Sequence, residues 1–146
     1  MESRDHAGMV AAILTAGYII KTESEAEDLA RTAEIYRDIK KRYEGMAGSV
    51  EDEELSLMAA VLTAGQIVNA STEVAGVEAV MDDFTCTRRI LLEMEKRYPG
   101  FLSEKAELNI IASVLVAGLI INTTDWEEGI MDNMLALRDC KNILKG

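Results

Sequence analysis

Three segments of this chain spell nearly the same apolar stretch. Residues 11–20 read AAILTAGYII, residues 59–68 read AAVLTAGQIV, and residues 112–121 read ASVLVAGLII. An alanine, a leucine, an Ala-Gly pair and an isoleucine occupy the same positions in all three copies. Such self-similarity is the signature of a repeated structural unit, so the fold must be one that three similar units build together.

Each unit continues into a second segment that also repeats: YRDIKKRYEG at 36–45, LEMEKRYPG at 92–100 and LRDCKNILKG at 137–146. The glycine of the first segment and the glycine that closes the second are 28 residues apart in units one and three, and 35 apart in unit two. The extra seven residues equal two helical turns, an insertion that preserves the helix face. We therefore expect one domain, 1–146, of three units at approximately 1–50, 51–101 and 102–146.

Hydrophobic periodicity predicts that both segments of each unit are helices. The first segments are apolar on nearly every face, whereas the second carry a heptad-like apolar stripe with charges on the remaining faces. Capping boxes at Ser24 with Glu27, Ser49 with Asp52 and Thr124 with Glu127 mark helix starts. These signals predict six helices at about 5–21, 24–44, 52–69, 73–98, 104–122 and 125–145.

The Ala-Gly pairs indicate how the first helices pack. Glycine inside a helix costs about 1 kcal/mol relative to alanine, and close backbone packing is the natural compensation. We expect an all-α fold of three helical hairpins, arranged as a compact bundle with pseudo-threefold symmetry around the three apolar helices. A short superhelical step between the hairpins, or a solenoid, is the alternative. The residues expected to pack between the inner helices are Ala16, Gly17, Ala64, Gly65, Ala117 and Gly118.

Charge and the apolar runs limit the partners. The formal net charge is −11, from 26 acidic and 15 basic residues, which disfavours nucleic acid and anionic membrane surfaces. The longest apolar runs, 9–20 and 110–121, are shorter than the roughly 20 residues of a membrane-spanning helix. The start, MESRDHAGMV, does not resemble a secretory signal, so we expect a cytoplasmic protein.

Acidic residues form the densest charge cluster in the sequence, and this cluster has two possible roles. Glu51, Asp52, Glu53 and Glu54 open a predicted helix, where carboxylates interact favourably with the helix dipole. The same residues, together with Trp126 just after a helix start, are our candidates for binding a protein partner. The basic residues lie mainly in final turns, which is also dipole placement.

Catalytic chemistry has little support in the sequence, and we predict no catalytic residue and no cofactor. A diiron centre is excluded because the single histidine, His6, has no glutamate three residues before it. A magnesium-dependent nucleotide hydrolase would use the carboxylates of Glu51, Glu54, Glu78 and Asp82, but the second pair has the wrong spacing. A second alternative is a small-ligand site in a pocket beside the inner glycines.

The pattern Ala-x-x-Leu-x-Ala-Gly, an acidic turn and a Tyr/Leu-Arg-Asp helix runs from AAILTAGYII to EIYRDIKKRY. It resembles short uncharacterised helical-hairpin proteins of tailed phages and prophages, here as three tandem units. The resemblance implies a small accessory protein of a mobile element and transfers no catalytic residue.

A non-enzymatic interaction or assembly protein is therefore the function that the sequence favours. Its partner is expected to be a protein, with basic character to match the acidic surface, and a homo-oligomer is a further expectation because the apolar helices exceed what six short helices hide. The magnesium-dependent hydrolase and the ligand-binding bundle stay as alternatives.

Overall fold

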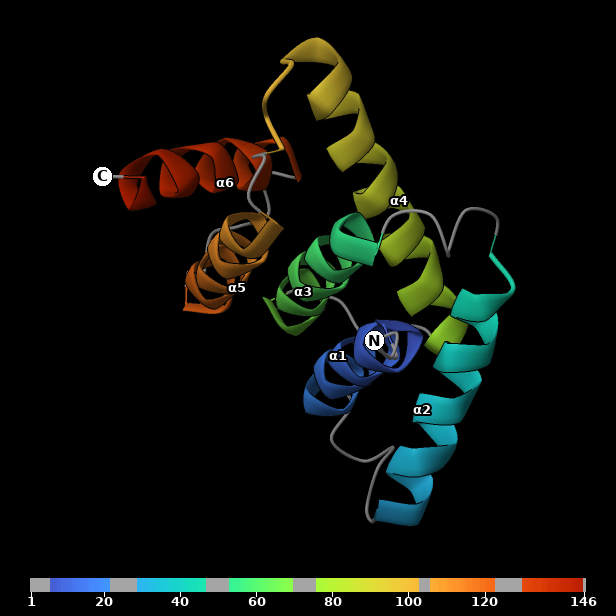
Figure 1. Cartoon of the computed structure of the whole chain (residues 1–146). Coiled ribbons are helices and arrows are strands. Elements are labelled where there is room, and N and C mark those ends of the chain that lie inside the picture. The colour runs from blue at the N-terminus through green and yellow to red at the C-terminus, as the bar shows by residue number, and fades with distance from the viewer. Residues whose placement is uncertain are drawn as a thin grey trace.

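The protein is all helical in the part that the computed structural model describes, which is residues 6–21, 29–46, 53–69, 76–102, 106–122 and 130–145. Six helices and no strand lie in these ranges, which confirms the predicted fold class (Figure 1). The helices are α1 (His6–Lys21), α2 (Leu29–Glu44), α3 (Glu53–Asn69), α4 (Gly76–Arg97), α5 (Ala106–Asn122) and α6 (Ile130–Leu144).

The helix ends agree with the predicted boundaries, whereas several predicted starts are not covered. The three capping boxes lie outside the described residues, as do the expected starts of α2, α4 and α6. After α4, Gly100 has a φ of +94°, a conformation that glycine adopts without steric penalty. The Glu95 carboxylate accepts hydrogen bonds from the backbone N–H groups of Gly100 and Leu102, at 3.0 and 2.9 Å, and so closes this turn.

The three apolar helices form a row in which α3 lies between α1 and α5 (Figure 1). The amphipathic helices form an outer layer, with α2 packed on α1, α4 on α3 and α6 on α5. This layer buries part of its predicted stripe, including Ile39, Phe84 and Leu137. The apolar stripe of the second segments also includes Leu29, Tyr98 and Leu144. These three side chains are exposed, so the prediction that the stripe is buried is wrong at these positions.

Glycine-on-alanine contacts join the helices of the row. A Cβ atom added to Gly17 would lie 2.9 Å from both Cα and Cβ of Ala64. One added to Gly65 would lie 3.1 Å from the same two atoms of Ala117. The backbones of α1 and α3 therefore each lie directly on an alanine of the next unit, as the Ala-Gly pairs predicted at these two positions.

This row does not confirm the predicted pseudo-threefold symmetry. A ring of three would pack α1 against α5, but these two helices lie on opposite sides of α3. The physical reason is that the step from α3 to α5 carries α5 to the side of α3 away from α1, instead of turning it back toward α1. At Gly118 the corresponding Cβ would meet nothing within 4 Å, so the series stays open.

The expectation that all three apolar helices lie at the centre is correct only for α3. Its residues from Leu55 to Ala60 are all buried. In contrast, α1 exposes Met9 and Ile20, and α5 exposes a whole face. The two outer helices of the row each lack a neighbour on one side among the described helices, because a row has two ends.

The glycine contacts predict that alanine has opposite effects at two equivalent positions. We expect Gly17→Ala to lower the free energy of unfolding by about 1–3 kcal/mol, because its methyl group overlaps the Ala64 backbone. Gly118→Ala, the matched control, should leave the stability unchanged or raise it by up to about 1 kcal/mol through helix propensity. Urea unfolding of dilute protein measures both values, and equal effects would contradict the packing described.

Candidate interaction surface

The most unusual surface of the molecule is an apolar face of α5. Ile111, Val114, Leu115 and Leu119 are each between 49% and 52% exposed, and Gly118 lies exposed among them. Their spacing places them on one side of the helix. We call this set of five residues the α5 face.

Positions of the α5 face are buried in the other two units. Ile111 and Leu115 correspond in the repeat to Val10 and Leu14 of α1, and to Met58 and Leu62 of α3. All four counterparts have no exposed surface. The same apolar positions therefore serve as core in units one and two and meet solvent in unit three.

Helix α5 has almost no charged side chains. Glu107, in its first turn, is the single charged residue between Ala106 and Asn122, whereas α2 has eight over a similar length. No helix in the described part of the chain is both long and apolar enough to cross a membrane, and α5 is included in that finding.

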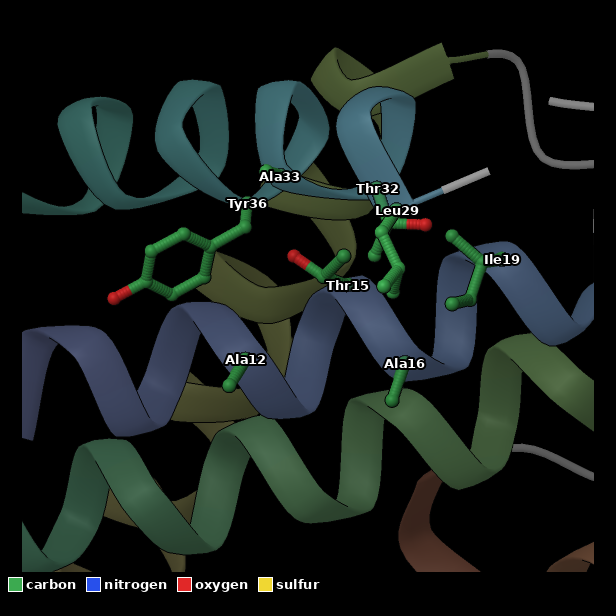
Figure 2. A pocket seen from close by; sticks show the side chains of 8 residues that line it. All are labelled: Ala12, Thr15, Ala16, Ile19, Leu29, Thr32, Ala33 and Tyr36. Carbon is green, nitrogen blue, oxygen red and sulfur yellow. The ribbon is translucent and has the colours of Figure 1, made fainter. Parts of the chain in front are cut away.

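A second apolar feature is a groove between α1 and α2, on the side of α1 away from α3. Its volume is about 440 Å³. Figure 2 shows Thr15 and Ile19 of α1 facing Leu29 and Tyr36 of α2 across it. No charged side chain is among the described residues that line the groove: Ala12, Thr15, Ala16, Ile19, Leu29, Thr32, Ala33 and Tyr36.

The predicted ligand pocket lies beside the inner glycines. The space that a side chain would occupy at Gly17 and Gly65 is filled by Ala64 and Ala117. Small residues at these two positions bring the helices together. The groove between α1 and α2 includes Ala16, the neighbour of Gly17, in its wall.

A buried polar cluster joins units two and three. Lys141 of α6 is only 3% exposed, and its Nζ donates hydrogen bonds to the Phe101 carbonyl and, at 3.2 Å, to Oδ1 of Asn109. The amide nitrogen of Asn109 donates in turn to the Glu54 carboxylate. The Lys141 Nζ also lies 4.5 Å from the centre of the Phe101 ring, a cation–π distance.

Burial lowers the pKa of Lys141 from 10.5 to about 8, and the nearby charge of Lys145 acts in the same direction. Glu95 and Glu54 oppose the shift. Placement in a final turn suggested only a dipole contact for Lys141, so sequence reasoning missed this role. We interpret this cluster as a structural contact between units two and three. Its donors and acceptors bond one another, and none of its residues lines the groove between α1 and α2.

A second polar link joins units one and two. Nε2 of His6 lies 3.1 Å from the Tyr43 hydroxyl, and Nδ1 lies 3.5 Å from the Glu53 carboxylate. The Tyr43 ring packs edge-on against Phe84, with 5.7 Å between centroids, and burial raises the Tyr43 pKa. The start of α1 is thus fastened to α2 and α3.

Some of the predicted site residues lie outside the described residues, and the others lie in helices. Glu51 and Asp52, with Trp126, lie outside the described residues. Glu53 and Glu54 are described, and each carboxylate contacts a side chain of a neighbouring helix, as set out above.

Glu78 and Asp82 lie exposed on α4. Among the described residues, no three His, Cys, Asp or Glu side chains gather in a way that could hold a metal ion. The carboxylates of the predicted hydrolase are therefore not brought together in the part of the chain that the structure covers.

No protein-family model, characterised protein or solved structure matches this chain. Its function is inferred below from its own residues and their geometry.

The buried Lys141 predicts a stability that depends on pH. Between about pH 8 and 10.5 the folded protein releases the Lys141 proton while the unfolded chain keeps it, so the free energy of unfolding should rise with pH. We expect a gain on the order of 1–3 kcal/mol relative to Lys141→Met, from about 1.4 kcal/mol per pKa unit. Urea unfolding of both proteins from pH 7.5 to 10 checks this, and parallel pH profiles would refute it.

Proposed function

We propose that this chain is a non-enzymatic interaction or assembly protein, and that the α5 face binds a protein partner. One observation carries the proposal: the α5 face exposes apolar residues whose counterparts in α1 and α3 are core. Contiguous apolar surface of this kind marks interaction sites in soluble proteins. A row of helices that stops at α5 leaves this surface ready to bury against another protein.

The composition of the face supports a protein ligand. Branched apolar side chains without charges resemble the centre of a protein interface, where charged residues are depleted. The glycine at position 118 allows a partner backbone to approach α5 closely, as Gly17 and Gly65 do inside the molecule.

The net charge of this chain favours one kind of residue around the contact surface of the partner. The excess of 11 negative charges favours a partner with basic residues around its contact surface, and salt should weaken such a complex. The resemblance to phage and prophage hairpin proteins extends the proposal to an accessory protein of a mobile element that acts in the cytoplasm. Nucleic acid and membranes are not proposed as partners.

Replacement of one residue on the α5 face tests the function. The full-length protein, its Leu115→Glu variant and its Leu92→Glu variant are used as baits for affinity capture at low and at high salt. Leu92 on α4 is a matched control, because it is also an exposed leucine of a helix but lies outside the α5 face. We expect the wild type and Leu92→Glu to capture the same protein, and Leu115→Glu to recover it at least about tenfold less.

Circular dichroism of the three baits verifies that each retains its helices. Capture of identical proteins by all three baits would refute the role of the α5 face. Absence of any captured protein at low salt, together with a purified chain that stays monomeric, would refute the interaction function itself.

A further inference from the structure

We propose that the α5 face of one molecule docks into the groove between α1 and α2 of a second copy of this chain. The inference rests on the proposed function, because it gives the same face a partner, here a second copy of this acidic chain in place of a basic protein. Three observations carry it: how the internal units contact one another, which halves of that contact are exposed, and the absence of charge on both halves.

The contact between units one and two is the first template. Helix α1 lies against both α3 and α4 and places Gly17 on Ala64. The residues of α3 that correspond to the α1 wall of the groove are Ala60, Thr63, Ala64 and Ile67. Three of these four, Ala60, Thr63 and Ile67, are at most 2% exposed. In unit two, three of the positions that form the groove wall in unit one are thus buried, and α1 contacts the fourth, Ala64.

The contact between units two and three repeats this arrangement. Helix α3 lies against α5 and places Gly65 on Ala117. The corresponding wall positions of α5, which are Ser113, Val116, Ala117 and Ile120, are all buried. Two successive interfaces therefore pair a face that contains the unit's glycine with a wall that contains the next unit's alanine.

One half of a third such interface is exposed at each end of the row. The α5 face presents Gly118 with Ile111 and Leu115, the counterparts of residues that α1 and α3 bury. At the other end, Ala12 and Ala16 of the groove are exposed, although the counterparts of Ala16, which are Ala64 and Ala117, contact a preceding helix. A second copy supplies the missing half at either end with the same residue types and the same spacing.

Neither surface has a charged residue that would oppose this contact. The five residues of the α5 face and the eight that line the groove are all uncharged. The net charge of −11 on each copy lies elsewhere, so two copies repel one another at long range. Salt screens this repulsion and should strengthen self-association, which is opposite to its effect on a basic partner.

The contact is heterologous, since it joins two different surfaces. Each added copy still exposes one face and one groove, so the association extends into a ring or a filament. An isologous dimer that packs α5 on α5 would instead stop at two copies.

Sedimentation velocity of the full-length chain, with two blocking variants, tests this geometry. The average mass of the wild type should rise with protein concentration and with salt. Gly118→Gln blocks the face and Ala16→Gln blocks the groove, and each should weaken self-association at least about tenfold. Both positions are exposed, and a Cβ at Gly118 meets nothing within 4 Å, so the fold should persist.

A mixture of the two variants is the decisive sample. Gly118→Gln retains an intact groove and Ala16→Gln an intact α5 face, so together they should form a one-to-one complex that grows no further. A wild type that remains monomeric at high salt, a Gly118→Gln variant that associates normally, or a mixture that forms no complex would each overturn the inference. A native mass spectrum that shows a monomer with a small molecule retained would also overturn it.

The experiments distinguish failure of this inference from failure of the proposed function. If the pure chain stays monomeric while capture of another protein still depends on Leu115, the inference fails and the function stands. If neither self-association nor capture depends on the α5 face, both fail.

Discussion

The contact between a glycine of one inner helix and an alanine of the next is the interaction on which the rest of the structure depends. It brings the backbones of α1 and α3, and then of α3 and α5, into direct contact. Apolar side chains on both sides of the glycines can then pack between helices that have almost no amphipathic character of their own. The outer helices cover the row from one side, so their charged faces remain in water.

The direction of this contact explains why the molecule has two dissimilar ends. Gly17 and Gly65 each lie on an alanine in the following unit, whereas Gly118 has no such contact within the chain. The middle unit is therefore the most buried, although the three inner helices have similar sequences. Exposure along the row is decided by position and not by the hydrophobicity of the helix, which is highest in α5.

Sequence reasoning found the helices and the small residues between them, because both leave local, repeated signals. The Ala-Gly pairs predicted close packing, and Gly17 and Gly65 have it. The choice between a ring and a row leaves no such signal, since both bury apolar helices and differ only in the rotation between successive units. The exposure of Leu115 was missed for this reason, because its sequence surroundings match those of the buried Leu62.

Sequence reasoning also missed the polar links, which depend on residues far apart in the chain. Lys141 has a position in a final turn that fits the helix dipole equally well, and its partner Phe101 is 40 residues earlier. His6 was considered only as a metal ligand, whereas it bonds Tyr43, 37 residues later. Glu53 and Glu54 were interpreted together as one acidic cluster, yet they contact opposite neighbours, His6 and Asn109.

The polar links have a consequence for how three nearly interchangeable units find their order during folding. Apolar contacts alone would also let α1 take the place of α3 on α5, because the two helices present similar side chains. In that wrong order Asn109 would face His6, the counterpart of Glu54, and the buried Lys141 would lose a compensating negative charge nearby. The polar contact between units two and three uses Glu54, and that between units one and two uses His6. A few polar residues therefore distinguish the otherwise similar units from one another.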